Sequence, residues 1–139
     1  MTYGRGGYGA AAASYKSSRV MSSTPVELVV MLHERLLADL RGAVIAIDAD
    51  NLDAKASRIQ SANDVIFELL SSLDRSAGGE VSDRLAALYG YMIQRIGDAS
   101  RTLDVRPLKE VEGHVESLLE AWSTLAADPP ETPHFVPGG

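Results

Sequence analysis

The segment from Gly78 to Ile96 constrains the fold most, because two adjacent glycines precede a regular apolar stripe. Either glycine can supply the left-handed residue that ends a helix. The stripe steps by four, three, four and four residues, which predicts a helix over 80–102 with one buried face. It comprises Val81, Leu85, Leu88, Met92 and Ile96.

Two large side chains of this predicted helix lie off its stripe. Tyr91 and Ile93 fall about 100° to either side of Met92 on the helix surface. We therefore expect Met92 and Leu88 to lie in the core, and Tyr91 and Ile93 to be accessible.

Three further segments show helical periodicity. The first opens with Thr24, Pro25 and Glu27, which form a capping box, and runs to about residue 49. The second opens at Asp50 and Asn51, and Pro107 suits the first turn of the last. Their expected buried positions are Leu28, Leu32, Leu36, Leu40, Ala43 and Ile47; then Leu52, Ala56, Ile59, Ile66, Leu70 and Leu73, with Asn63 as the polar member; then Leu108, Val111, Val115, Leu118, Trp122 and Leu125.

The predicted architecture is an all-α, antiparallel, up-down four-helix bundle. Short links force neighbouring helices to run antiparallel, and no useful stretch alternates with the period of a strand. Residues 1–23 are predicted to form a flexible or short-helical basic arm, residues 24–127 the bundle, and residues 128–139 a disordered Pro-rich tail.

Charge and composition exclude several classes of function. The chain has 139 residues, no cysteine and a net charge of −6. Residues 1–25 hold Arg5, Lys16 and Arg19 and no acid, so the rest carries 10 basic and 19 acidic groups, a net charge of −9. An acidic body repels a phosphate backbone, so we expect no nucleic-acid ligand. Without a long apolar run or a signal-peptide core, the chain is predicted to be cytoplasmic and not to insert into a membrane.

The motifs that could indicate a catalytic or metal site each lack the sequence context that such a site requires. Residues 4–9 match G-x-G-x-x-G, but no strand precedes them and no helix follows directly. The residue three positions before His33 and before His114 is a valine rather than the glutamate that a di-metal bundle requires, and His134 lies in the predicted tail. Glu110 and His114 share a helix face, which an ordinary surface pair explains. We therefore predict no enzyme activity, no metal and no cofactor.

A histidine phosphotransfer bundle stays open as an alternative. The sequence resembles that class in being helical, but the glycine one turn after the reactive histidine is missing after both His33 and His114. A purely structural bundle that dimerises through its apolar patch is a second alternative.

Three segments resemble the FliS family of flagellar secretion chaperones. The first is 23–32, Ser-Thr-Pro-Val-Glu-Leu-Val-Val-Met-Leu, preceded by Tyr15 and Val20. The second is Gly-Gly-Glu-Val at 78–81 followed by Leu85, Tyr91 and Arg95, and the third is Leu-Leu-Glu-Ala-Trp at 118–122. Departures from the family pattern include His33-Glu34-Arg35, where Tyr-Asp-Gly is usual.

The resemblance implies a cytosolic chaperone that binds the disordered C-terminal region of flagellin, prevents premature polymerisation and presents it for export. It also implies contacts with export-gate or regulatory proteins and a monomer in the absence of client. Such a client can lay amphipathic helices into apolar grooves. We expect the groove to use apolar residues that lie off the core stripes, namely Tyr91 and Ile93 together with Val65 and Phe67 beside Ile66, and the basic residue of the second segment, Arg95.

Tyr15 and Val20 allow two interpretations. They could cover the empty groove until the client displaces them, or they could staple the start of the first helix permanently. We favour the first, because the arm is basic and yet carries apolar anchors.

Overall fold

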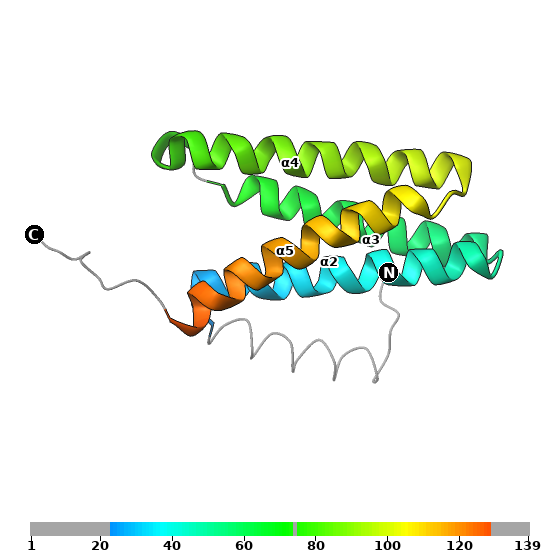
Figure 1. The fold of residues 1–139 in the computed structure, drawn as a ribbon, viewed down its shortest axis with the longest axis horizontal. Helices are drawn as coiled ribbons and strands as arrows, with labels where there is room; N and C mark the ends of the chain where they lie inside the picture. Colours follow the sequence, from blue (N-terminus) through cyan, green and yellow to red (C-terminus); the bar gives the residue numbers. More distant parts are fainter. Residues whose placement is uncertain (1–22, 74, 129–139) are drawn as a thin grey trace, which may run out of the picture.

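A computed structural model describes residues 23–73 and 75–128 of the chain. These ranges form four α-helices in the order α2 (Pro25–Asp48), α3 (Leu52–Ser71), α4 (Arg75–Thr102) and α5 (Arg106–Ala127). Consecutive helices run in opposite directions, so the predicted up-down four-helix bundle is confirmed (Figure 1). Helix α2 packs against α3 and α5, and α4 packs against the same two helices. Residues 1–22 of the predicted arm and 129–139 of the predicted tail lie outside the described residues.

Local signals set the starts of α2 and α3 as predicted, whereas α4 begins at Arg75 rather than at residue 80. At the start of α2, the Thr24 side chain accepts a hydrogen bond from the Glu27 backbone N–H at 3.1 Å. The Glu27 carboxylate accepts one from the Thr24 backbone N–H at 2.9 Å, which completes the capping box. Asn51 caps α3 by accepting from the Ala54 backbone N–H at 3.0 Å.

The end of α3 differs from the prediction. This helix stops at Ser71, well before the glycine pair, and the hydroxyls of Ser71 and Ser72 donate to the carbonyls of Glu68 and Leu69. Such side-chain bonds satisfy the last carbonyls of the helix. Gly79 does adopt a positive φ of 55°, as expected of one of the two glycines, but it separates the first turn of α4 from the long remainder.

The core lies between all four helices. Its fully buried centre includes Leu36, Leu40, Ile66, Met92, Ile96, Leu108 and Val111. Leu52 and Ala56 are exposed, contrary to the predicted stripe of the second segment. Helix α3 instead turns Ala62, Val65 and Leu69 inward, because its buried face is rotated toward the neighbouring α2.

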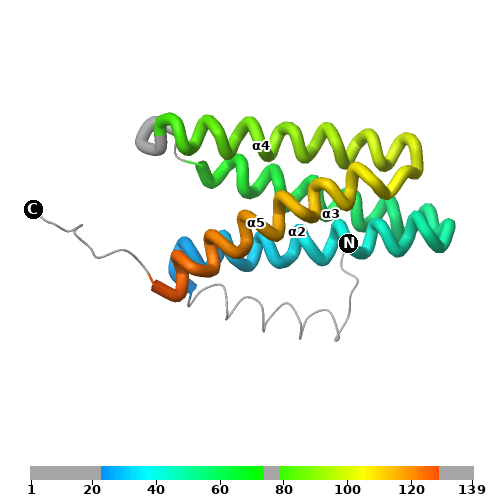
Figure 2. The backbone as a smooth tube through the Cα atoms, viewed as in Figure 1, coloured from blue at the N-terminus to red at the C-terminus, as the bar shows by residue number. Residues whose placement is uncertain are grey.

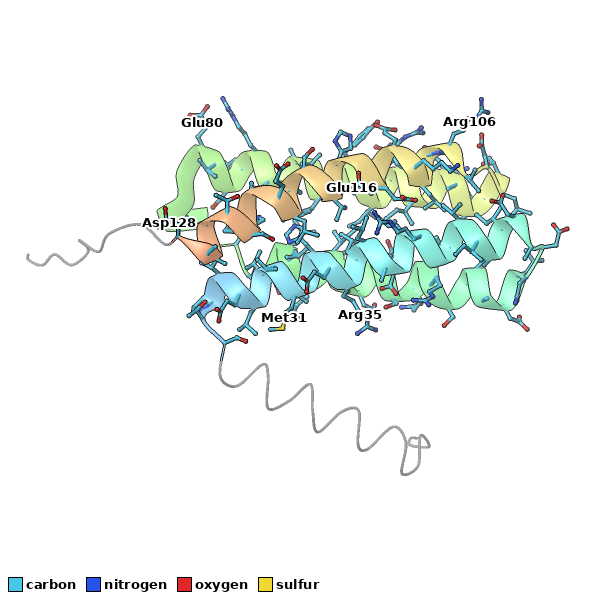
Figure 3. The ribbon with its side chains drawn as sticks, turned by 60° about the horizontal axis from the view of Figure 1, so that its bottom comes forward. Met31, Arg35, Glu80, Arg106, Glu116 and Asp128 are labelled. Atoms are coloured by element: carbon cyan, nitrogen blue, oxygen red, sulfur yellow. The ribbon has the colours of Figure 1, made fainter. Side chains whose placement is uncertain are left out.

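The α4–α5 pair is not parallel along its whole length. Helix α5 begins beside the end of α4 and finishes beside the start of α2, so it moves away from the start of α4 (Figures 1 and 2). Figure 3 places Glu80 and Asp128 at this wide end of the molecule and Arg106 at the narrow end. The divergence leaves the inward sides of both helices less covered at the wide end.

Candidate functional site

An apolar surface occupies the wide end, where α4 starts and α5 finishes. Val81 was expected in the core, but it is 67% exposed. Leu88, which was also expected in the core, is only partly buried. The same holds for four other apolar residues of the two helices: Leu85, Leu118, Trp122 and Leu125. We call this surface the open apolar face: Val81, Leu85, Leu88, Leu118, Trp122 and Leu125.

A polar network closes the open apolar face on its narrow side, where α4 and α5 meet. The Tyr91 hydroxyl donates to one carboxylate oxygen of Glu110 at 2.6 Å, and Arg95 Nε donates to the other at 2.9 Å. His114 Nε2 lies 3.4 Å from Glu110, and its ring meets the Tyr91 ring edge-on at 6.2 Å. Tyr91 keeps 39% of its surface exposed, as predicted, three residues beyond Leu88 on the same side of α4.

The electrostatics of this network follow from Glu110. Hydrogen bonds from Tyr91 and Arg95 lower the pKa of the Glu110 carboxyl below its usual value. The bond to that carboxylate raises the pKa of Tyr91, because an ionised phenol could not donate. The network therefore carries a carboxylate and a neutral phenol at neutral pH, and it joins α4 to α5 beside the apolar face.

Ile93 does not share this surface with Tyr91. Lys55 of α3 donates to the Ser100 hydroxyl of α4 at 3.2 Å, which shows which side of α4 faces α3. Ile93 precedes Ser100 by two helical turns and therefore also faces α3, where it is half-buried against the core. The two residues predicted to share a groove thus lie on opposite sides of α4.

A concave surface lies between α2 and α3. This α2–α3 groove has a volume of about 270 Å³, and its lining includes Leu32, Arg35, Ser61, Asp64, Val65 and Glu68. The expectation that Val65 lies off the core is wrong, because it is only 7% exposed and joins the core cluster. Phe67, three residues after Asp64, is 56% exposed, as its predicted role requires.

A buried carboxylate lies beneath the polar side of the α2–α3 groove. Asp39 of α2 is almost inaccessible and accepts hydrogen bonds from Ser61 Oγ at 2.5 Å and Arg58 Nη1 at 3.1 Å. Arg35 Nε lies 3.6 Å from the same carboxylate. Gly42 makes room for the arginine, since an added Cβ would lie 2.5 Å from Arg58 Nε.

Another concave surface separates the first turns of α2 from the last turns of α5. It has a volume of about 440 Å³ and is lined by Ser23, Glu27, Val30, Met31, Ser123, Ala126 and Ala127. Tyr15 and Val20, which were predicted to cover a groove, lie outside the described residues.

His33 is buried and cannot accept a phosphoryl group in this fold. Its Nδ1 lies 2.9 Å from the Val29 carbonyl, which can only accept, so Nδ1 carries the proton. Nε2 then accepts from the Tyr89 hydroxyl at 2.9 Å. Burial lowers the pKa of His33 and raises the pKa of Tyr89 to about 12, so both groups are neutral near pH 7.

The described residues hold no cluster of three or more metal-ligating side chains. Within the same ranges, no helix is both long and apolar enough to cross a bilayer. The geometry thus defines a helical-bundle protein with an open apolar face between the diverging ends of α4 and α5.

Comparisons with known proteins identify which helical-bundle family this is. The family model described as Flagellar protein FliS matches residues 8–129. The Bacillus subtilis flagellar secretion chaperone FliS is 35% identical over 109 residues, covering 78% of this chain and 80% of the relative. The chaperones of the same name from Salmonella typhimurium and Escherichia coli are 33% and 32% identical, covering 78% and 81% of this chain and 82% and 83% of theirs. The chain belongs to the FliS family.

Sequence reasoning missed the open apolar face as a surface. It assigned Val81, Leu118 and Trp122 to the core, because their spacing is that of a buried stripe. The spacing of α4 and α5 alone could not reveal the divergence of their axes. The stripes continue to the helix ends with the same spacing as in the core, so the sequence does not distinguish these positions from buried ones.

Proposed function

We propose that this protein is a cytoplasmic flagellar export chaperone that binds the disordered C-terminal region of flagellin. In this role it prevents premature polymerisation and delivers the client to the export apparatus. Membership of the FliS family supports the chaperone role, and the exposure of Val81 at the open apolar face supports binding of an apolar segment. The main observation behind the proposal is that Val81, the first residue of the apolar stripe of α4, is exposed.

The open apolar face fits an amphipathic helix. A client segment that is disordered alone would gain helical structure as its apolar side chains cover Leu85, Leu88 and Trp122. Ordering the segment costs conformational entropy, so the buried apolar area has to outweigh this cost.

Tyr91 and Arg95 would bind the client at the edge of this face. The exposed Tyr91 ring extends the apolar surface beyond Leu88, while its hydroxyl stays bonded to Glu110. Arg95 has a fixed position because Glu110 and Asp98 both bind its guanidinium. We expect this rigid polar edge to set the register of the bound helix rather than to supply most of the affinity.

Calorimetry with a synthetic flagellin C-terminal peptide, combined with circular dichroism, tests the proposal. We expect one-to-one binding with a negative heat-capacity change and a gain of helix beyond the sum of the components. Absence of both binding and helix gain would refute it. A structural bundle that dimerises through the same face would instead elute as a dimer without client, whereas we expect a monomer.

Tyr15 and Val20 remain candidates for a segment that competes with the client. If they cover the open apolar face, a Tyr15→Ala/Val20→Ala variant should bind the peptide more tightly than the wild type. Equal or weaker binding would argue instead for a permanent contact at the start of α2.

A further inference from the structure

The α2–α3 groove lies on the side of the bundle away from the open apolar face. Helix α2 contacts α3 and α5, and α4 contacts the same two helices, so the α2–α3 side is opposite the α4–α5 side. Figure 3 shows Arg35, on the edge of the groove, pointing away from α4 and α5. A ligand in the groove would therefore leave the open apolar face accessible.

The cations near the groove are already neutralised. Arg35 and Arg58 both approach the buried Asp39 carboxylate, and Arg35 also donates to Ser61 Oγ at 3.0 Å. By contrast, Asp64 and Glu68 form no ion pair with any residue in 23–73 or 79–128. Both are exposed, and they are four residues apart, on the same side of α3.

Apolar groups accompany these two carboxylates. Leu32 and Val65 line the groove, and both pack against the core, so their positions are fixed. Phe67 is exposed on the outward side of α3, between Asp64 and Glu68 in the sequence. Phe67 follows Asp64 by three residues, so the two are neighbours on the helix surface. An exposed aromatic ring near a carboxylate can contact both the aliphatic stem and the charge of a lysine or arginine.

We infer that the α2–α3 groove binds a basic amphipathic segment of a second protein partner. An apolar side chain of that segment packs on Leu32 and Val65, and flanking Lys or Arg side chains pair with Asp64 and Glu68. The acidic body of the chain, with a net charge of −9 beyond residue 25, attracts such a segment over a longer range. Because the groove is on the opposite side of the bundle, the partner and a client on the open apolar face can bind together.

A labelled amphipathic peptide with Leu and Lys at helical spacing tests this inference on the full chain. Fluorescence anisotropy gives its affinity, and amide chemical shifts map its site. We expect shifts at Leu32, Ser61 and Val65, and no binding of the same peptide with Glu in place of Lys. The Asp64→Asn/Glu68→Gln variant should bind about 10-fold more weakly, because two exposed ion pairs are lost.

A matched variant controls for general charge attraction. Asp83→Asn/Glu120→Gln removes the same two charges from exposed positions on α4 and α5 and should bind the peptide as the wild type does. An equal loss in both variants, or shifts confined to the open apolar face, would overturn the inference.

The chain's own basic arm is the competing occupant. Because the chain lacks cysteine, a spin label at Lys16→Cys is specific. Broadening of the Asp64 and Glu68 amide signals by this label would show that the arm fills the groove and would also overturn the inference.

Discussion

The effect of a Gly42→Ala substitution on the free energy of unfolding should depend on Arg58, which lies across the α2–α3 interface. In a helix interior, Gly→Ala normally stabilises by about 1 kcal/mol. At Gly42, however, the new Cβ would lie 2.5 Å from Arg58 Nε and 2.9 Å from its Cδ and Cζ, so the arginine must move. Moving it removes the 3.1 Å bond to Asp39, which is almost fully buried.

The free-energy cost of moving Arg58 depends on the contacts that the Asp39 carboxylate still makes. Removing one partner of a buried ion pair costs about 3–5 kcal/mol. Here Ser61 and Arg35 still contact the carboxylate, and the Arg58 side chain is itself half-exposed, so we expect about 1–2 kcal/mol. Gly42→Ala should therefore leave the free energy of unfolding unchanged or lower it by up to about 1 kcal/mol.

A double-mutant cycle measured by urea denaturation isolates this effect. In an Arg58→Ala background the clash is gone, so Gly42→Ala should stabilise by about 1 kcal/mol, giving a coupling of about 1–2 kcal/mol. Gly113→Ala is the matched control, since an added Cβ there meets nothing within 4 Å, and it should stabilise equally in both backgrounds. An equal gain from Gly42→Ala in both backgrounds would refute the reasoning.

Three further predictions concern stability. Tyr89→Phe removes the donor to His33 Nε2 and should lower the free energy of unfolding by about 1–2 kcal/mol, measured by urea denaturation; no loss would mean that Nε2 finds another donor. Burial lowers the folded-state pKa of His33, so its contribution to the free energy of unfolding should be fully present above pH 6.5 and should be lost as the pH falls below that value. A His33→Gln variant should lose less stability over that range, and an equal loss would contradict the assignment of this pH dependence to His33. Asp50 adopts a φ of 55° just after α2, so Asp50→Gly should raise the melting temperature by a few degrees, and a lower one would contradict a strain at this turn.

Helix starts were predictable because their causes are local. The Thr24–Glu27 capping box and the Asn51 cap need only residues within one turn, and the sequence contains them in full. The order and direction of the helices followed from the short links. The positive φ at Gly79 followed from glycine chemistry, although the side chains of Ser71 and Ser72 had already ended α3.

The exposure of individual side chains and the hydrogen bonds between helices depend on how the helices pack, so they could not be predicted from local sequence. Val81 continues a core stripe, and only the divergence of α5 leaves it exposed. Val65 is buried because α3 turns this side toward α2. His33 and Tyr89 are 56 residues apart in the chain, and no local pattern indicates that they share a hydrogen bond.

The central claim is that the open apolar face binds the flagellin C-terminal segment. Val81 is 67% exposed on this face, and Ile45 is 69% exposed on the outward side of α2, so the two form a matched pair. Covering Val81 should contribute about 1–2 kcal/mol at roughly 25 cal/mol per Å². Calorimetry on the full chain should therefore show about 10-fold weaker peptide binding for Val81→Gln and unchanged binding for Ile45→Gln. Wild-type affinity in Val81→Gln, or an equal loss in Ile45→Gln, would contradict the claim.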